Sequence, residues 1–190
     1  MSQHPLQPQN LEEHIAVLDG EDLLAYREML VFRKELRIEA EKFVDLPPSK
    51  WPQLSFNWDF KPESQCYALD GVKTNEFQKS YPLGFCLAWV EFSEFDNELC
   101  SFNRRNDEDE IWSIGCKSKV AEVIAYVARG LPITPILANV NCLNQLCLNG
   151  GNHRYVVAKF SGVIKFLPVY YEATRYDAIS NIVTLHDNVT

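Results

Sequence analysis

Apolar residues recur at every third or fourth position over the first quarter of the chain, which predicts one long helix. The residues that share this spacing are Ala25, Met29, Phe32, Leu36, Ala40 and Phe43. Acidic residues in 19–22 suit the positive end of a helix dipole, and Leu46-Pro47-Pro48 ends the helix near Val44. Because the other face is heavily charged, we expect the helix either to cover the sheet or to serve as an interaction arm. Residues 1 to about 18 are predicted to form a flexible or loosely docked leader.

Short strands are predicted between Trp51 and Phe102. Apolar and polar residues alternate from Leu54 to Phe60, the period of a half-buried strand, and the segment from Gly84 to Phe92 is apolar enough for a buried one. Aromatic residues are frequent in this region. They indicate the aromatic core of a small sheet, with a base-stacking surface as the alternative.

Helices and strands alternate over the C-terminal eighty residues. The predicted strands are 111–114, 136–140, 146–148 and 166–171, and the predicted helices begin near 117, 152 and 174. Gly130 and Gly162 are expected to end the first two helices. The fold class is therefore α/β (α+β): a small mixed sheet flanked by helices, formed by residues 51–190, with 1–50 as a helical N-terminal extension.

The turn Asn149-Gly150-Gly151-Asn152-His153-Arg154-Tyr155 lies between a predicted strand and a predicted helix. Two glycines let the backbone turn sharply and approach a ligand closely. The helix start adds unpaired N–H groups that favour an anion, and the arginine fork matches phosphate geometry. We interpret this turn as a phosphate site, with a plain tight turn as the alternative.

The net charge is −8, whereas proteins that grip DNA through counterion release are usually basic. A DNA-binding role therefore needs a local basic patch or a bound metal. The segment from Asn103 to Glu110 carries the densest charge of the chain. Its simplest interpretation is a solvated loop. The sharper hypothesis is that Asp107 and Asp109 hold Mg²⁺ between phosphates and protein.

The six cysteines are scattered, with no Cys-x-x-Cys pair, and several stand in apolar runs. This pattern argues against a zinc site and favours a reducing cytoplasm. The polar first ten residues do not resemble a secretory signal, and no apolar run reaches the roughly 20 residues that a membrane helix needs. Membrane insertion is therefore not expected.

Residues 150–155 resemble the Gly-Gly-Cys-His-Arg-Tyr signature of the sulfiredoxins and, more loosely, the Gly-x-x-Arg box of ParB proteins. The resemblance extends over about 111–172 and includes Lys117-Ser118-Lys119-Val120 and the Leu-Pro-Ile-Thr-Pro-Ile segment 131–136. It implies a ParB/sulfiredoxin fold and an ATP site made by Lys119, Gly150, Gly151, Asn152, His153 and Arg154. Asn152 stands where sulfiredoxins have the catalytic cysteine, so cysteine-sulfinate reduction is not expected.

Chain length, acidity and this asparagine together resemble the plasmid-encoded oncogenic suppression activity proteins, which are fertility inhibitors. That resemblance implies ATP hydrolysis with Mg²⁺ and DNA cleavage in the cytoplasm, at the inner face of the membrane if a type IV secretion complex is met. His153, Arg154 and Glu122 are the expected catalytic residues, although a structural ion pair would also explain Glu122. The competing hypothesis is a non-enzymatic protein that occludes a secretion component, with a vestigial nucleotide site.

Overall fold

A four-stranded mixed sheet forms the centre of the computed structural model, which describes residues 6–69, 72–113 and 115–188. Its strand order is β2-β6-β4-β5; the β6–β4 pair is parallel and the two outer pairs are antiparallel. A parallel two-stranded sheet pairs β1 with β3. The strands are β1 Asn57–Trp58, β2 Cys86–Glu91, β3 Pro132–Ile133, β4 Ile136–Val140, β5 Leu146–Gly150 and β6 Phe166–Tyr171.

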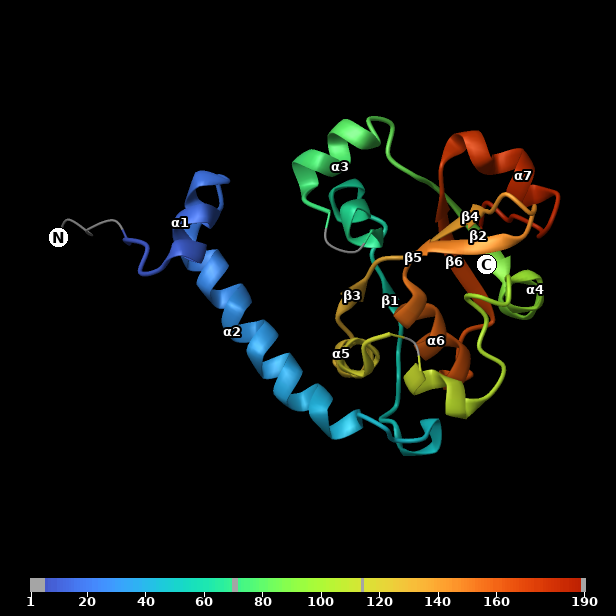
Figure 1. Ribbon diagram of the computed structural model, residues 1–190, viewed down its shortest axis with the longest axis horizontal. Coiled ribbons are helices and arrows are strands. Elements are labelled where there is room, and N and C mark those ends of the chain that lie inside the picture. Colours follow the sequence, from blue (N-terminus) through green and yellow to red (C-terminus); the bar gives the residue numbers. More distant parts are fainter. Residues whose placement is uncertain (1–5, 70–71, 114, 189–190) are drawn as a thin grey trace.

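Helices lie on both sides of this sheet in Figure 1, so the predicted class of small mixed sheets flanked by helices is confirmed. The α-helices are α1 Leu11–Leu18, α2 Leu23–Ala40, α3 Thr74–Ser80, α4 Phe92–Glu98, α5 Lys117–Ala128, α6 Asn152–Ser161 and α7 Tyr176–Ser180. The 3-10 helices are η1 Glu41–Phe43, η2 Pro48–Lys50, η3 Pro62–Ala68, η4 Glu108–Ser113 and η5 Ala173–Arg175. No described helix is both long and apolar enough to cross a membrane.

The main core lies between the sheet and the pair of helices α5 and α6. Val120 and Ile124 of α5 are fully buried, as are Val156 and Val157 of α6, and all four belong to one apolar cluster with strand residues. α5 and α6 pack against each other. Their apolar faces therefore fix how the first turns of the two helices lie, and the candidate site forms there.

The N-terminal segment is more ordered than the predicted leader. Residues 11–18 form α1, which packs against α2. Glu13 is 5% exposed and accepts two hydrogen bonds from the Arg27 guanidinium, which lowers the Glu13 pKa to about 2. A helix at 11–18 was not predicted; the Asn10 side chain caps its first turn, and the Glu13–Arg27 contact holds it on α2.

The long helix was predicted correctly, but its packing partner was not the sheet. Leu36 and Ala40 of α2 join a small apolar cluster with Ala121 and Ala125 of α5, so α2 covers a helix. Figure 1 shows the N-terminal part of α2, together with α1, lying away from the sheet. The interaction arm that the sequence left as an alternative stays a prediction for this part of the helix.

Three predicted elements differ from the structure. The strand predicted at 111–114 is the end of η4 instead; Ile114 lies outside the described residues. Isoleucines at 111 and 114, three apart in the sequence, fit the period of a 3-10 helix better than the two-residue period of a strand. The predicted strand 54–60 shrinks to the two residues of β1, and the predicted helix 174–185 to η5 and the five residues of α7.

Candidate functional site

A cleft of about 460 Å³ opens between α5 and the start of α6. Five of the residues that the sequence assigned to the site line it together: Lys119, Glu122, Gly151, His153 and Arg154. These residues come from two helices that are about thirty positions apart in the chain. The described structure therefore brings the two halves of the predicted motif to one place.

The two glycines are required by close contacts. A Cβ on Gly150 would lie 2.0 Å from the carbonyl oxygen of Ala68, which no side chain tolerates. Gly151 has φ +86° and begins α6, and a Cβ there would lie 2.9 Å from Ile136 and 3.0 Å from the Arg154 guanidinium. Gly151 lines the cleft, whereas Gly150 does not line it and lies against the backbone at the end of η3.

Arg154 lies in the first turn of α6 but is only 7% exposed. Its Nη1 donates to the carbonyl oxygens of Thr134 and Pro135 at 2.8 and 3.1 Å and to the Thr134 hydroxyl, and its Nη2 donates to the Ala68 carbonyl at 3.2 Å. These bonds connect α6, the β3–β4 connection and η3. The sequence predicted that Arg154 binds a ligand phosphate; in the structure its guanidinium is hydrogen-bonded to the backbone segments that surround the cleft.

Asn152, at the position of the sulfiredoxin cysteine, also has a structural contact. Its side-chain oxygen accepts a hydrogen bond of 2.8 Å from Asn103. Asn103 is 3% exposed, and its own oxygen accepts the backbone N–H of Leu148. Asn152 thus ties the loop that follows α4 to the start of α6.

The α5 side of the cleft is more open. Lys119 is exposed in the first turn of α5. Glu122, one turn later, lies 3.4 Å from the Arg37 guanidinium of α2, so the ion pair that the sequence left as an alternative is present. The Glu122 side chain is still 31% exposed and lines the cleft. An exposed pair of this kind contributes little to stability and can be rearranged when a ligand binds.

Among the other residues that line the cleft, Asp59, Tyr67 and Thr134 carry polar groups that sequence reasoning did not assign to the site. Asp59 accepts hydrogen bonds from the Ser64 hydroxyl and the Lys61 backbone, and these bonds, the Ser64 bond first, lower the pKa of the Asp59 carboxyl. Tyr67 and Thr134 also line the cleft. Thr134 belongs to the 131–136 segment of the motif, whereas no sequence signal distinguishes Asp59 or Tyr67 from ordinary surface residues.

A second hollow, of about 290 Å³, adjoins the cleft. Its lining residues are Phe102, Arg105, Gly115, Cys116, Lys119, Asn152 and His153, of which Lys119 and His153 also line the cleft. Cys116 precedes α5, and hydrogen bonds from the Ser118 hydroxyl and from two backbone N–H groups lower the pKa of its thiol.

The acidic run contributes nothing to the cleft, since the described residues that line it include neither Asp107 nor Asp109. Both side chains are exposed, and Asp109 faces a separate hollow with Asp45 and Lys117. Within the described ranges, no three His, Cys, Asp or Glu side chains are close enough to hold a metal. The carboxylates that face the predicted phosphate site are those of Asp59 and Glu122.

Chemically, the cleft combines cationic donors with two carboxylates. Lys119 and the first N–H groups of α6 suit phosphate oxygens, while Asp59 and Glu122 supply the oxygen ligands that Mg²⁺ prefers. The comparisons with known proteins add no relative: no protein-family model, no curated protein and no solved structure matches this chain. Function is therefore inferred from the geometry of the cleft and from the motif.

Proposed function

We propose that this chain is a ParB/sulfiredoxin-like domain that binds ATP in the cleft between α5 and α6. The supporting observation is that Lys119 and Glu122 line one cleft with Gly151 and His153. The two pairs are about thirty residues apart in the sequence. The Lys119 ammonium and the N-terminus of α6 attract the phosphates, and Arg154 keeps the cleft walls in place for them.

The residues present fit a magnesium nucleotide. Mg²⁺ is usually held by one or two carboxylates together with substrate phosphates, and Asp59 and Glu122 offer such a pair. Bound there, the ion would neutralise negative charge on the phosphates. The Lys119 ammonium orients the phosphate chain, and the His153 imidazole serves as the acid–base group at the same wall.

The biological role follows from the motif resemblance to the oncogenic suppression proteins. We place the chain among plasmid fertility inhibitors that block type IV secretion of DNA, through ATP hydrolysis and cleavage of the transferred strand, in the cytoplasm at the secretion complex. Sulfinate reduction is excluded from the proposal because the Asn152 amide cannot form a sulfur-linked intermediate.

A second candidate is a non-enzymatic interaction protein. The observation in its favour is the arm formed by α1 and α2, where several apolar side chains are exposed, Leu11 by 74% and Leu18 by 85%. Exposed apolar surface of this kind is found where proteins dock. In that case the arm occludes a secretion component, and the cleft is vestigial.

Measuring plasmid transfer from donor cells that express the protein separates the two. If the cleft carries the function, Lys119→Ala relieves the block on transfer, whereas the double variant Leu11→Asp, Leu18→Asp still blocks. The opposite result, with the arm variant inactive and Lys119→Ala fully active, would refute the enzymatic proposal. Expression levels of both variants must match the parent.

A further inference from the structure

The cleft and the second hollow meet at two residues. Lys119 and His153 line both, whereas Tyr67 lines only the cleft. We call these two adjoining cavities, of about 460 and 290 Å³, the groove. The ligand that fills the whole groove must therefore extend beyond its phosphate contacts in both directions.

An exposed aromatic side chain lies in each part of this groove. Among the described residues, the two most exposed aromatic side chains are Phe102, at 85%, and Tyr67, at 66%. Phe102 lines the second hollow and Tyr67 lines the cleft. An aromatic ring exposes a flat face of the kind on which nucleobases stack.

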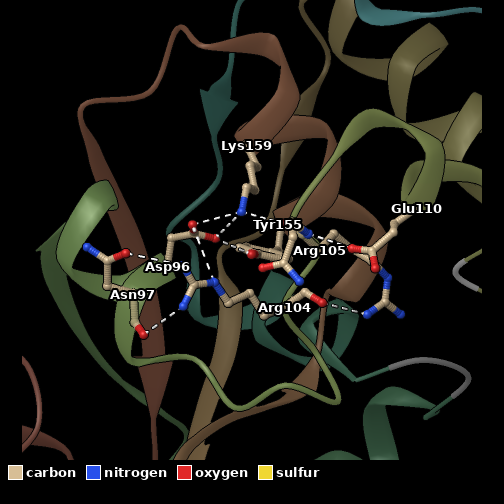
Figure 2. A network of polar contacts seen from close by, with 8 residues as sticks. Asp96, Asn97, Arg104, Arg105, Glu110, Tyr155 and Lys159 are labelled. Atoms are coloured by element: carbon tan, nitrogen blue, oxygen red, sulfur yellow. Dashed lines mark hydrogen bonds and ion pairs between the residues drawn. The ribbon is translucent and has the colours of Figure 1, made fainter.

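Phe102 is held in its exposed place by the loop around it. Next to it, Asn103 donates to Asn152, and Arg104 donates to the Asn97 carbonyl and side chain. The backbone oxygen of Arg105 accepts from Lys159, which also binds Asp96 (Figure 2). These bonds fix the loop after Phe102, and the Cys100 N–H, which donates to the Leu146 carbonyl, fixes it before Phe102. A partner that stacks on Phe102 therefore meets little cost of ordering this loop.

The charge distribution matches a single strand better than a duplex. Lys119 and His153 are shared by the two cavities that hold the exposed aromatic side chains. Arg105 adds positive charge to the second hollow, so the cations are local, and the Asp59 and Glu122 carboxylates line the cleft but not this hollow. The chain as a whole carries a charge of −8, which opposes the broad phosphate contact of a duplex. Only unpaired bases can stack on separate side chains while their linking phosphate faces a local cation.

We infer that this groove binds a single-stranded nucleic acid, with one base on Tyr67, one on Phe102 and the intervening phosphates at Lys119 and His153. The inference rests on the proposed function, because the same two basic residues hold the nucleotide phosphates there. It adds the path of the strand across the surface and two binding residues that the sequence motif does not contain.

The test measures binding of fluorescein-labelled (dT)₈ by fluorescence anisotropy, in EDTA so that no strand is cleaved. Phe102→Ala is expected to weaken binding about tenfold, the loss that follows from removing one stacked base, and Tyr67→Ala similarly. Phe102→Trp should retain binding, and Leu83→Ala, which removes an apolar side chain that is 93% exposed, is the matched control. (rU)₈ distinguishes RNA from DNA as the strand bound.

A chemical footprint tests the same path independently. Cys116 lines the second hollow, while Cys142 is an exposed cysteine elsewhere and serves as the internal control. Saturating (dT)₈ should slow alkylation of Cys116 several-fold and leave Cys142 unchanged, and ATP alone should not protect Cys116.

Equal affinity of Phe102→Ala and the parent for (dT)₈, unprotected Cys116, or tighter binding of the duplex than of the single strand would overturn the inference. ATP titration of the same variants keeps the two proposals apart. Loss of (dT)₈ binding in Phe102→Ala supports the groove even if no ATP binds, in which case only the nucleotide proposal falls.

Discussion

The two walls of the cleft differ in how much the fold depends on them. On the α6 wall, Arg154 and Tyr155 are buried and hydrogen-bonded to distant parts of the chain. On the α5 wall, Lys119 is exposed and Glu122 has an exposed ion pair. The α6 side chains therefore fix the shape of the site, whereas the charged α5 side chains that line it are more exposed to solvent. Residues of one sequence motif can thus serve either the stability of the fold or the binding of a ligand.

The largest effect is expected from Arg154→Ala. It removes the donor for three carbonyl oxygens and one hydroxyl that are buried with it. Buried acceptors left without donors are costly, so we expect a loss of about 3–5 kcal/mol in the free energy of unfolding, measured with urea. Arg154→Lys, which keeps the charge but not the fork, should lose less. An unfolding midpoint equal to the parent's would show that these bonds do not stabilise the fold.

Gly150→Ala should be the next most damaging change. Its Cβ would meet a backbone oxygen at 2.0 Å, so the turn or η3 must shift, at about 3 kcal/mol. Gly130→Ala is the matched control, because φ there is +65° but no atom lies within 4 Å. That variant should lose only about 1–2 kcal/mol from backbone strain. Equal losses in the two variants would mean that the contact with Ala68 is unimportant.

The sequence predicted some parts of the fold and of the site correctly and missed others. The strands 136–140 and 166–171 were predicted with the observed bounds, because continuous apolar runs leave few alternatives. The sequence also located the Gly-Gly turn and the ends of α5 and α6 at Gly130 and Gly162. It did not show that Arg154 is surrounded by carbonyl oxygens, since those come from residues 68, 134 and 135. Tyr67 and Asp59 join the cleft only through tertiary packing, which no local pattern records.

A smaller effect is expected from Tyr155→Phe. The Tyr155 hydroxyl donates to Asp96, which Lys159 also binds, as Figure 2 shows, so losing it should cost about 1–2 kcal/mol. Retention of the parent's full stability would contradict a stabilising role for this bond.

The same hydroxyl predicts an alkaline limit to stability. Burial raises the pKa of Tyr155, and burial raises that of Tyr170 to about 12, whereas an unfolded tyrosine titrates near 10. The unfolded chain therefore loses these protons first, and stability should fall as pH rises above about 10. The fall should be shallower in Tyr155→Phe, and urea unfolding at pH 9 to 11 measures it. An identical slope in both proteins would contradict the assignment.

The smallest effect on stability belongs to the α5 wall. Lys119→Ala should change the free energy of unfolding by less than about 0.5 kcal/mol, since exposed side chains contribute little. Lys117→Ala, on the same helical turn and paired with Asp45 at the surface, is the matched control. A loss as large as that of Arg154→Ala would remove the distinction between the two walls.

Calorimetric titration of ATP with Mg²⁺ into the parent, Lys119→Ala and Lys117→Ala tests the central claim most directly. A charge-assisted phosphate contact is worth roughly 1.5–3 kcal/mol, so Lys119→Ala should bind about ten- to hundredfold more weakly, with Lys117→Ala like the parent. No heat of binding in the parent, or equal affinity in all three proteins, would contradict the assignment of this cleft as the nucleotide site.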